Sequence, residues 1–166
     1  LDSVEVLTRL RDAGLDSLPG AGAEILVDRV RRLVAPLKIS TQEWLDVMEA
    51  AHGLGLRSTV TMMMGMVETP AERVEHLLCA RDLQDRTAGF RAFISWPYQP
   101  TRKLKTAVAS GADYLRLVAL ARIFLDNIDH IGGSWLTTGH DVGQMSLRFG
   151  ADDLGSVMLE ENVVRA

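Results

Sequence analysis

The feature that most constrains the fold of this chain is a repeated alternation of short apolar segments with longer segments of helical periodicity. The apolar runs end in polar loops, and they span residues 14–20, 57–65, 90–97, 131–139 and 155–161. Strands that alternate with helices are typical of a parallel sheet that is covered by helices. The sequence therefore predicts an α/β fold.

Two of the predicted helices carry strong start signals. Ser40 and Glu43 have the spacing of a capping box, and Thr69 and Glu72 repeat that spacing with Pro70 at the first helical position. Such pairs satisfy backbone N–H groups that would otherwise lack a partner at the helix start. We expect long helices within 40–55, 69–84 and 112–126, and shorter helices at 2–13, 23–34 and 141–148.

Five strand–helix units leave two architectures open. A TIM-type (βα) barrel has eight strands in roughly 250 residues, so three further N-terminal units of about 30 residues would bring these 166 residues close to that size. In that case residues 1–166 form the C-terminal portion of one barrel domain, with about its last five βα units. A complete five-stranded open sheet is the alternative, and the pattern alone does not decide between the two.

Composition and charge exclude several classes of function. The net charge is −4 and the largest basic cluster is residues 29–32, so we expect no nucleic-acid partner. The apolar runs are far shorter than a membrane span, so we expect no membrane partner. The single cysteine, Cys79, excludes an internal disulfide and indicates a reducing, cytoplasmic compartment. It also excludes an iron–sulfur cluster that is held by this chain alone. The four histidines show no metal-ligand spacing, and they are His52, His76, His130 and His140.

Polar residues that directly follow the apolar runs are the candidate site residues, because ligands of parallel α/β folds bind at the carboxyl ends of the strands. Glu24 follows the first run, Glu68 the second and Gln99 the third. The two glutamates also suit a structural role, since a helix N-terminus attracts negative charge. The last two runs contribute further candidates, which are Ser134, Trp135, Thr138 and Glu161.

Four segments of the chain resemble a group of radical S-adenosylmethionine enzymes that act in the futalosine route to menaquinone or form the deazaflavin cofactor. The segments are "AGLDSLPGAGAEIL", "HGLGLRSTVTMMMGMVETPAERVEHLL", "AFISWPYQP" and "SLRFGADDLGSVMLEENVV". The likeness extends over nearly the whole chain. Within the group, "GGSWLTTG" and "GSVMLEENVV" favour the cyclising branch of the futalosine route.

The resemblance implies a radical S-adenosylmethionine barrel with two cofactors, S-adenosylmethionine and a [4Fe–4S] cluster. The cluster motif of the family, C-x3-C-x2-C, is absent from this sequence, so its ligands would lie in an N-terminal part, and the chain alone should not catalyse the reaction. The resemblance further implies a nucleoside-like substrate and an electron donor protein such as flavodoxin or ferredoxin. Pairing of two copies across open sheet edges, to give a homodimer, is a further expectation.

The resemblance also gives roles to individual residues. It assigns Glu24, Gly65, Glu68 and Gln99 to S-adenosylmethionine. It assigns Ser134, Trp135, Thr138, Gln144 and Glu161, more loosely, to the substrate. The family usually has a histidine where Met66 stands, so no polar role is expected there.

Two other interpretations remain open at this point. The second hypothesis is a sister enzyme of the same group, which forms aminofutalosine or the deazaflavin cofactor. A non-catalytic module that kept a nucleoside pocket is the alternative from a different functional class.

Overall fold

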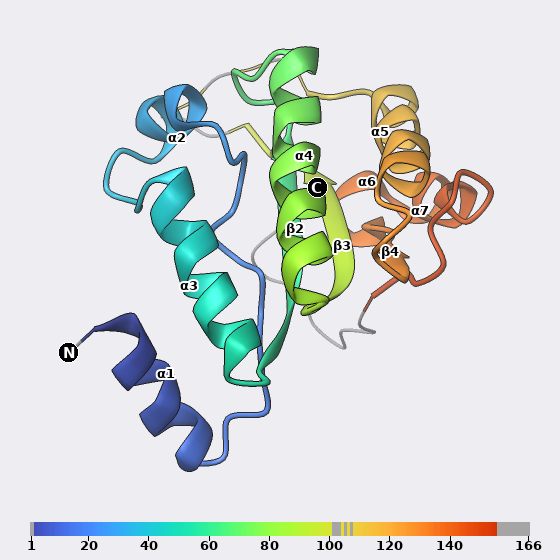
Figure 1. Cartoon of the computed structure of the whole chain (residues 1–166). Helices are drawn as coiled ribbons and strands as arrows, with labels where there is room; N and C mark the ends of the chain where they lie inside the picture. Colours follow the sequence, from blue (N-terminus) through green and yellow to red (C-terminus); the bar gives the residue numbers. More distant parts are fainter. Residues whose placement is uncertain (1, 101–103, 105, 107, 156–166) are drawn as a thin grey trace.

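The computed structural model, which describes residues 2–100, 104, 106 and 108–155, contains one sheet of parallel strands. Its strands follow the chain order β1–β2–β3–β4, and each pairs in parallel with the next (Figure 1). They are β1 (Ser17–Leu18), β2 (Arg57–Met64), β3 (Phe90–Pro97) and β4 (His130–Gly132). The predicted parallel α/β fold is confirmed.

The helices fall close to the segments that the sequence predicts. They are α1 (Ser3–Asp12), α2 (Asp28–Val34), α3 (Thr41–Gly53), α4 (Pro70–Thr87), α5 (Gly111–Phe124), α6 (Trp135–Thr138) and α7 (His140–Ser146). Both predicted capping boxes are present, at the starts of α3 and α4. Within the described part of the chain, every helix is too short or too polar to cross a lipid bilayer.

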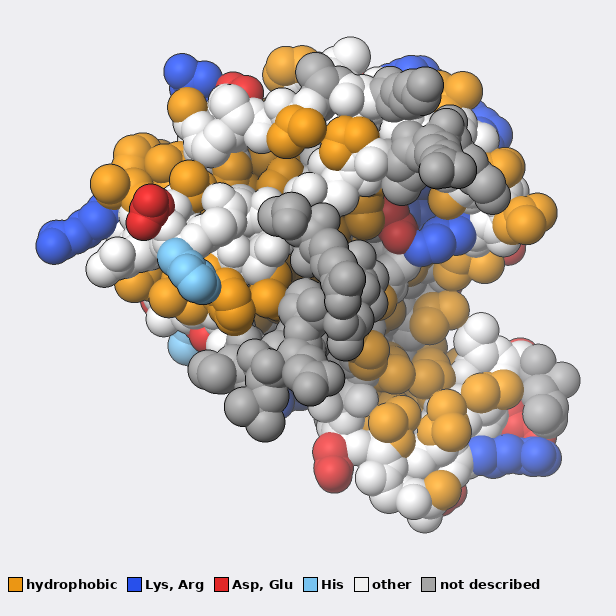
Figure 2. All heavy atoms as spheres, turned by 180° about the vertical axis from the view of Figure 1, so that it is seen from behind, with side chains coloured by type: hydrophobic (Ala, Val, Ile, Leu, Met, Phe, Trp, Pro, Cys, Tyr) orange, Lys and Arg blue, Asp and Glu red, His pale blue; other side chains and the backbone are white. Residues whose placement is uncertain are grey.

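The core lies between the sheet and the helices α3, α4 and α5, which cover one face of it (Figure 1). Val60, Met62 and Met64 alternate along β2 and are fully buried on this face, as is Phe93 of β3. Side chains on the opposite face, such as Met63 and others of β2 and β3, are only partly buried. Figure 2 shows the molecule from that opposite side, with many hydrophobic side chains at its surface. The helices α3, α4 and α5 therefore form one layer, on one face of the sheet.

Three segments differ from the sequence-based expectation. The helix expected at 23–34 begins only at Asp28, because Glu24 has a left-handed backbone (φ 42°) that no α-helix accommodates. The strand expected at 131–139 ends at Gly132, and residues after Gly133 form α6 instead. The run at 14–20 contributes a strand of only two residues.

The fifth predicted strand, 155–161, lies outside the described residues except for Gly155. Just before it, Asp153 forms a parallel bridge with Gly132 of β4. The chain thus returns to the free edge of β4 at the place where the sequence predicts the next strand.

Candidate binding site at the carboxyl edge of the sheet

The loop that follows β1 is held in place by hydrogen bonds to its backbone. The Gly20 N–H donates to Oγ1 of Thr59 (2.8 Å), and Oγ1 of Thr61 donates to the Gly20 carbonyl (2.7 Å). A side chain does not fit at Gly20, because a Cβ atom there would lie 1.9 Å from the Thr59 carbonyl oxygen. The backbone of the loop therefore packs directly against β2 at Gly20.

Arg31 organises the second half of this loop. Its guanidinium is almost fully buried and donates to the carbonyl oxygens of Gly22 (3.1 Å), Ala23 (2.6 Å) and Ile39 (2.7 and 2.9 Å). Burial lowers the pKa of Arg31, and the nearby carboxylate of Glu24 opposes that shift. The position of Arg31 does not indicate this role, since it lies in a basic run that would ordinarily face solvent.

Glu24 lies at the end of the loop with one of its two carboxylate oxygens unused. Oε1 pairs with the ammonium group of Lys38, whereas Oε2 is buried and has no hydrogen-bond partner among the residues that the structure describes. The backbone carbonyl of Glu24 accepts the N–H of Met63 (2.9 Å), which ties the residue to the end of β2. A strained backbone and a buried free acceptor at one residue are typical of a ligand-binding position.

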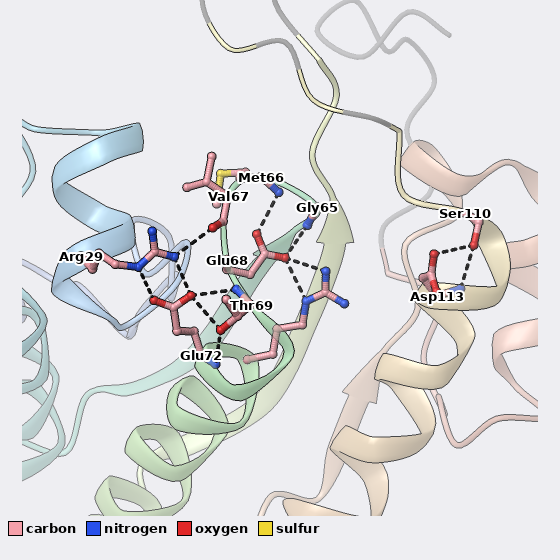
Figure 3. A network of polar contacts seen from close by, with 10 residues as sticks. Arg29, Gly65, Met66, Val67, Glu68, Thr69, Glu72, Ser110 and Asp113 are labelled. Atoms are coloured by element: carbon pink, nitrogen blue, oxygen red, sulfur yellow. Dashed lines mark hydrogen bonds and ion pairs between the residues drawn. The ribbon is translucent and has the colours of Figure 1, made fainter.

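Glu68 lies in the turn between β2 and α4, and its carboxylate is fully used within the protein (Figure 3). Oε1 accepts the N–H of Gly65 (2.6 Å), and Oε2 accepts the N–H of Met66 (2.9 Å). Arg73 adds two contacts to Oε1, from Nε (2.9 Å) and Nη2 (2.8 Å). The side chain of Glu68 has no exposed surface.

Gly65 has the positive φ (86°) that favours glycine. A Cβ atom there would lie 3.0 Å from Cβ of Ala109, so Ala109 occupies the space beside it. The turn therefore contributes to the site through its backbone conformation.

A cavity of about 420 Å³ opens at the ends of β2 and β3. It is lined by Met63, Trp96, Pro97, Tyr98, Gln99, Ser134, Leu136 and Thr137. Two of the predicted site residues, Gln99 and Ser134, thus come together in one apolar cavity with few polar groups, as in most small-molecule sites.

Two of the remaining substrate candidates, Trp135 and Thr138, lie on α6 itself, and Gln144 lies on α7. Oγ1 of Thr138 donates to the Ser134 carbonyl (2.8 Å) and so caps the local backbone. Trp135 and Gln144 line a second cavity of about 440 Å³, where the Trp135 ring lies 5.1 Å from that of His140. Glu161 lies outside the described residues. The expected single substrate set is therefore divided between two cavities on either side of α6.

The described residues contain no group of three or more His, Cys, Asp or Glu side chains that could hold a metal ion. Burial raises the pKa of the Cys79 thiol, which disfavours the thiolate form that binds iron. His52 contacts Oγ1 of Thr87 (2.8 Å) and Oγ of Ser58 (2.9 Å), and so has a packing role. His76 lies on α4 and is fully buried.

The chain is similar to known proteins over nearly its whole length. Residues 87–166 match the family model for the CofH/MqnC C-terminal region. The chain is 61% identical, over 162 residues, to a cyclic dehypoxanthine futalosine synthase of Streptomyces coelicolor. The match covers 96% of this chain and 41% of that enzyme. It is 49% identical over 98% of its length to the enzyme of that name from Halalkalibacterium halodurans, of which it covers 44%.

A third relative carries a different name. The chain is 43% identical over 96% of its length to an aminodeoxyfutalosine synthase of Thermus thermophilus, of which it covers 45%. The chain thus spans less than half the length of each of these relatives.

Proposed function

We propose that the intact protein that carries this chain is a radical S-adenosylmethionine enzyme that cyclises dehypoxanthine futalosine to its spiro form in menaquinone biosynthesis. The observation that carries the proposal is the 61% identity, over nearly the whole chain, to a cyclic dehypoxanthine futalosine synthase. Identity to the sister enzyme, aminodeoxyfutalosine synthase, is 43%. The cavity at the carboxyl edge of the sheet supports a small-molecule ligand.

We propose further that the chain is part of a TIM-type barrel. The strands follow each other in strict chain order, and the helices α3, α4 and α5 cover one face (Figure 1). A doubly wound open sheet reverses its strand order and carries helices on both faces, whereas a barrel is wound in one direction only. Parallel sheets are normally covered on both faces, so the partly exposed face here fits the interior of a barrel.

For S-adenosylmethionine, Glu24 is the residue whose geometry fits best. Its free Oε2 is a buried acceptor that suits a hydroxyl donor such as a ribose diol. We assign Gln99 to the same ligand, because its amide lies at the wall of the cavity, and we assign Gly65 and Glu68 to the turn that shapes it. When bound, S-adenosylmethionine supplies the radical chemistry of the family. The residues of this chain bind and orient it, and the apolar walls exclude water that would quench the reaction.

We propose Ser134, Trp135, Thr138, Gln144 and Glu161 as contacts of the nucleoside substrate. Ser134 already exchanges a hydrogen bond with Oγ1 of Thr137 (2.8 Å) and is therefore held at the cavity wall. We assign no residue of this chain to the [4Fe–4S] cluster, because the sequence has one cysteine and the described residues contain no set of metal ligands. We therefore assign no step of the reaction to residues of this chain acting on a cluster.

The test is to supply the intact, reconstituted protein with dehypoxanthine futalosine or with the substrates of the sister enzymes, and to identify products by mass. A cyclised product that is two hydrogen atoms lighter than the substrate supports the proposal, because the ring-closing C–C bond replaces two C–H bonds. Turnover of a sister substrate alone would assign the sister function, and ligand binding without any turnover would indicate a non-catalytic module.

A matched pair of variants tests the assignment of Glu24. Glu24→Gln should weaken binding of S-adenosylmethionine by about tenfold, which corresponds to one hydrogen bond to a charged group. Glu75→Gln, at an exposed glutamate of α4, should leave the affinity unchanged. Equal affinities in the two variants would remove Glu24 from the site.

A further inference from the structure

The peptide unit between Met64 and Gly65, at the end of β2, is held from both sides. Its carbonyl oxygen accepts the backbone N–H of Tyr98 (2.7 Å), and its N–H donates to Oε1 of Glu68 (2.6 Å). Because a peptide unit is planar, these two hydrogen bonds together fix its orientation. The position of the Tyr98 backbone is thereby linked to the carboxylate of Glu68.

Glu68 can hold this peptide only while its carboxylate is fixed in place. A carboxylate without exposed surface is costly unless it is paired and hydrogen-bonded. Arg73 provides that pairing through two nitrogen atoms, Nε and Nη2, that contact Oε1. A cation in the first turn of a helix is disfavoured by the helix dipole, so the needs of α4 do not explain why an arginine stands at this position.

The contacts of Tyr98 extend this connection to the cavity. Tyr98 and its neighbour Gln99 both line the cavity at the carboxyl edge. We propose that Arg73 is a positioning residue: through Glu68 and the Met64–Gly65 peptide, it sets the place of the cavity wall at Tyr98 and Gln99. The identification of S-adenosylmethionine as the ligand at this wall rests on the proposed function. The connection from Arg73 to Tyr98 does not.

A neighbouring ion pair provides a matched control. Arg29 of α2 contacts both oxygens of Glu72 (2.6 and 2.7 Å) in the same first turn of α4, and donates to the Val67 carbonyl (2.9 Å). It therefore stabilises the same helix start, but none of its contacts reaches the Met64–Gly65 peptide (Figure 3). If Arg73 merely anchors the start of α4, then Arg73→Met and Arg29→Met should act alike.

Hydrogen–deuterium exchange of the intact protein without ligand tests the link directly. Arg73→Met should speed exchange at the Tyr98 amide by about tenfold, because its acceptor is no longer held. Arg29→Met should leave that amide unchanged. Arg73→Lys keeps the positive charge but loses the contact through two nitrogen atoms, so exchange at the Tyr98 amide should have an intermediate rate. This variant also serves as the test if Arg73→Met does not fold. Equal exchange at Tyr98 in the Arg73 and Arg29 variants would overturn the proposal.

Calorimetric titration with S-adenosylmethionine then tests the consequence for binding. The dissociation constant should rise by about tenfold in Arg73→Met, and by less in Arg73→Lys, relative to Arg29→Met. Faster exchange with an unchanged dissociation constant would refute the role of Arg73 at the cavity. If the wild-type protein does not bind S-adenosylmethionine, the proposed function fails while the exchange result still decides the link.

Discussion

His76 should make the fold sensitive to acid between about pH 7 and pH 5, where carboxylates barely titrate. Its ring is fully buried on α4, and its Nδ1 accepts the N–H of Leu26 (2.9 Å). The neutral ring therefore carries its proton on Nε2, which has no hydrogen-bond partner among the described residues. A second proton could go only to Nδ1, where it would break the hydrogen bond to Leu26. Burial, aided by the positive charge of Arg31, lowers the pKa of His76 to about 3.

The size of the effect follows from the difference in pKa between the two states. An unfolded histidine has a pKa of about 6.5, so below that pH the unfolded chain binds a proton that the folded protein does not. Stability is therefore complete above about pH 6.5 and falls as the pH is lowered towards 3. At pH 5 the loss is about 2 kcal/mol, from roughly 1.4 kcal/mol for each pKa unit crossed. Burial also lowers the pKa of His52, which adds a loss of the same sign.

The perturbation that isolates His76 is His76→Asn, which retains a hydrogen-bond acceptor but does not titrate. Urea unfolding at pH 7 and pH 5 measures the free energy of unfolding of each variant. The constant cost of the smaller side chain cancels, because each variant is compared only with itself. The difference between the two pH values should shrink by about 2 kcal/mol in His76→Asn. His140→Asn, the same substitution at an exposed side chain, should retain the wild-type difference. An undiminished difference in His76→Asn would refute the reasoning.

Three further substitutions test the local structure by urea unfolding. Gly20→Ala should destabilise the protein by about 3 kcal/mol, since its Cβ meets the backbone of Thr59, whereas Gly53→Ala, with open space around it, should be close to neutral. A small effect of the first would show that the loop can move away. Ala88→Gly should stabilise the protein by about 1 kcal/mol, because Ala88 ends α4 with φ 49°; a loss of stability would contradict this. Thr69→Ala should cost about 1 kcal/mol through loss of the α4 cap, and no loss would mean that the capping box contributes little.

The parts of the fold that the sequence predicts correctly depend on neighbouring residues. The capping boxes at Ser40 and Thr69 join residues three positions apart, and the spacing alone identifies them. The predicted helix start at residue 23 is wrong, because the observed start at Asp28 depends on residues that are distant in the sequence. Ile25, Leu26 and Val27 have helical-looking apolar character, but their conformation is set by contacts with distant residues, such as the Leu26–His76 hydrogen bond.

The candidate site was predictable only at the level of strand ends. The carboxyl ends of parallel strands meet at one edge, and this rule correctly brought Gln99 and Ser134 to one cavity. The rule does not identify Arg31 as a residue that organises the loop, because its carbonyl partners come together only when the chain has folded. Nor could it foresee that α6 would place Trp135 and Ser134 beside different cavities.

Glu24 and Glu68 show most clearly what the structure adds, because the sequence presents them as two equivalent acids after two strands. The carboxylate of Glu68 is consumed by two backbone N–H groups and Arg73, whereas Glu24 keeps one buried oxygen free. Glu68→Gln should therefore cost about 3 kcal/mol of stability by breaking a buried ion pair, and weaken ligand binding only indirectly. Glu24→Gln should cost less than about 1 kcal/mol, because the Lys38 side of its pair is exposed, and yet weaken binding directly. Urea unfolding and ligand titration of both variants separate the two roles. If Glu24→Gln loses stability while binding is unchanged, the assignments must be exchanged.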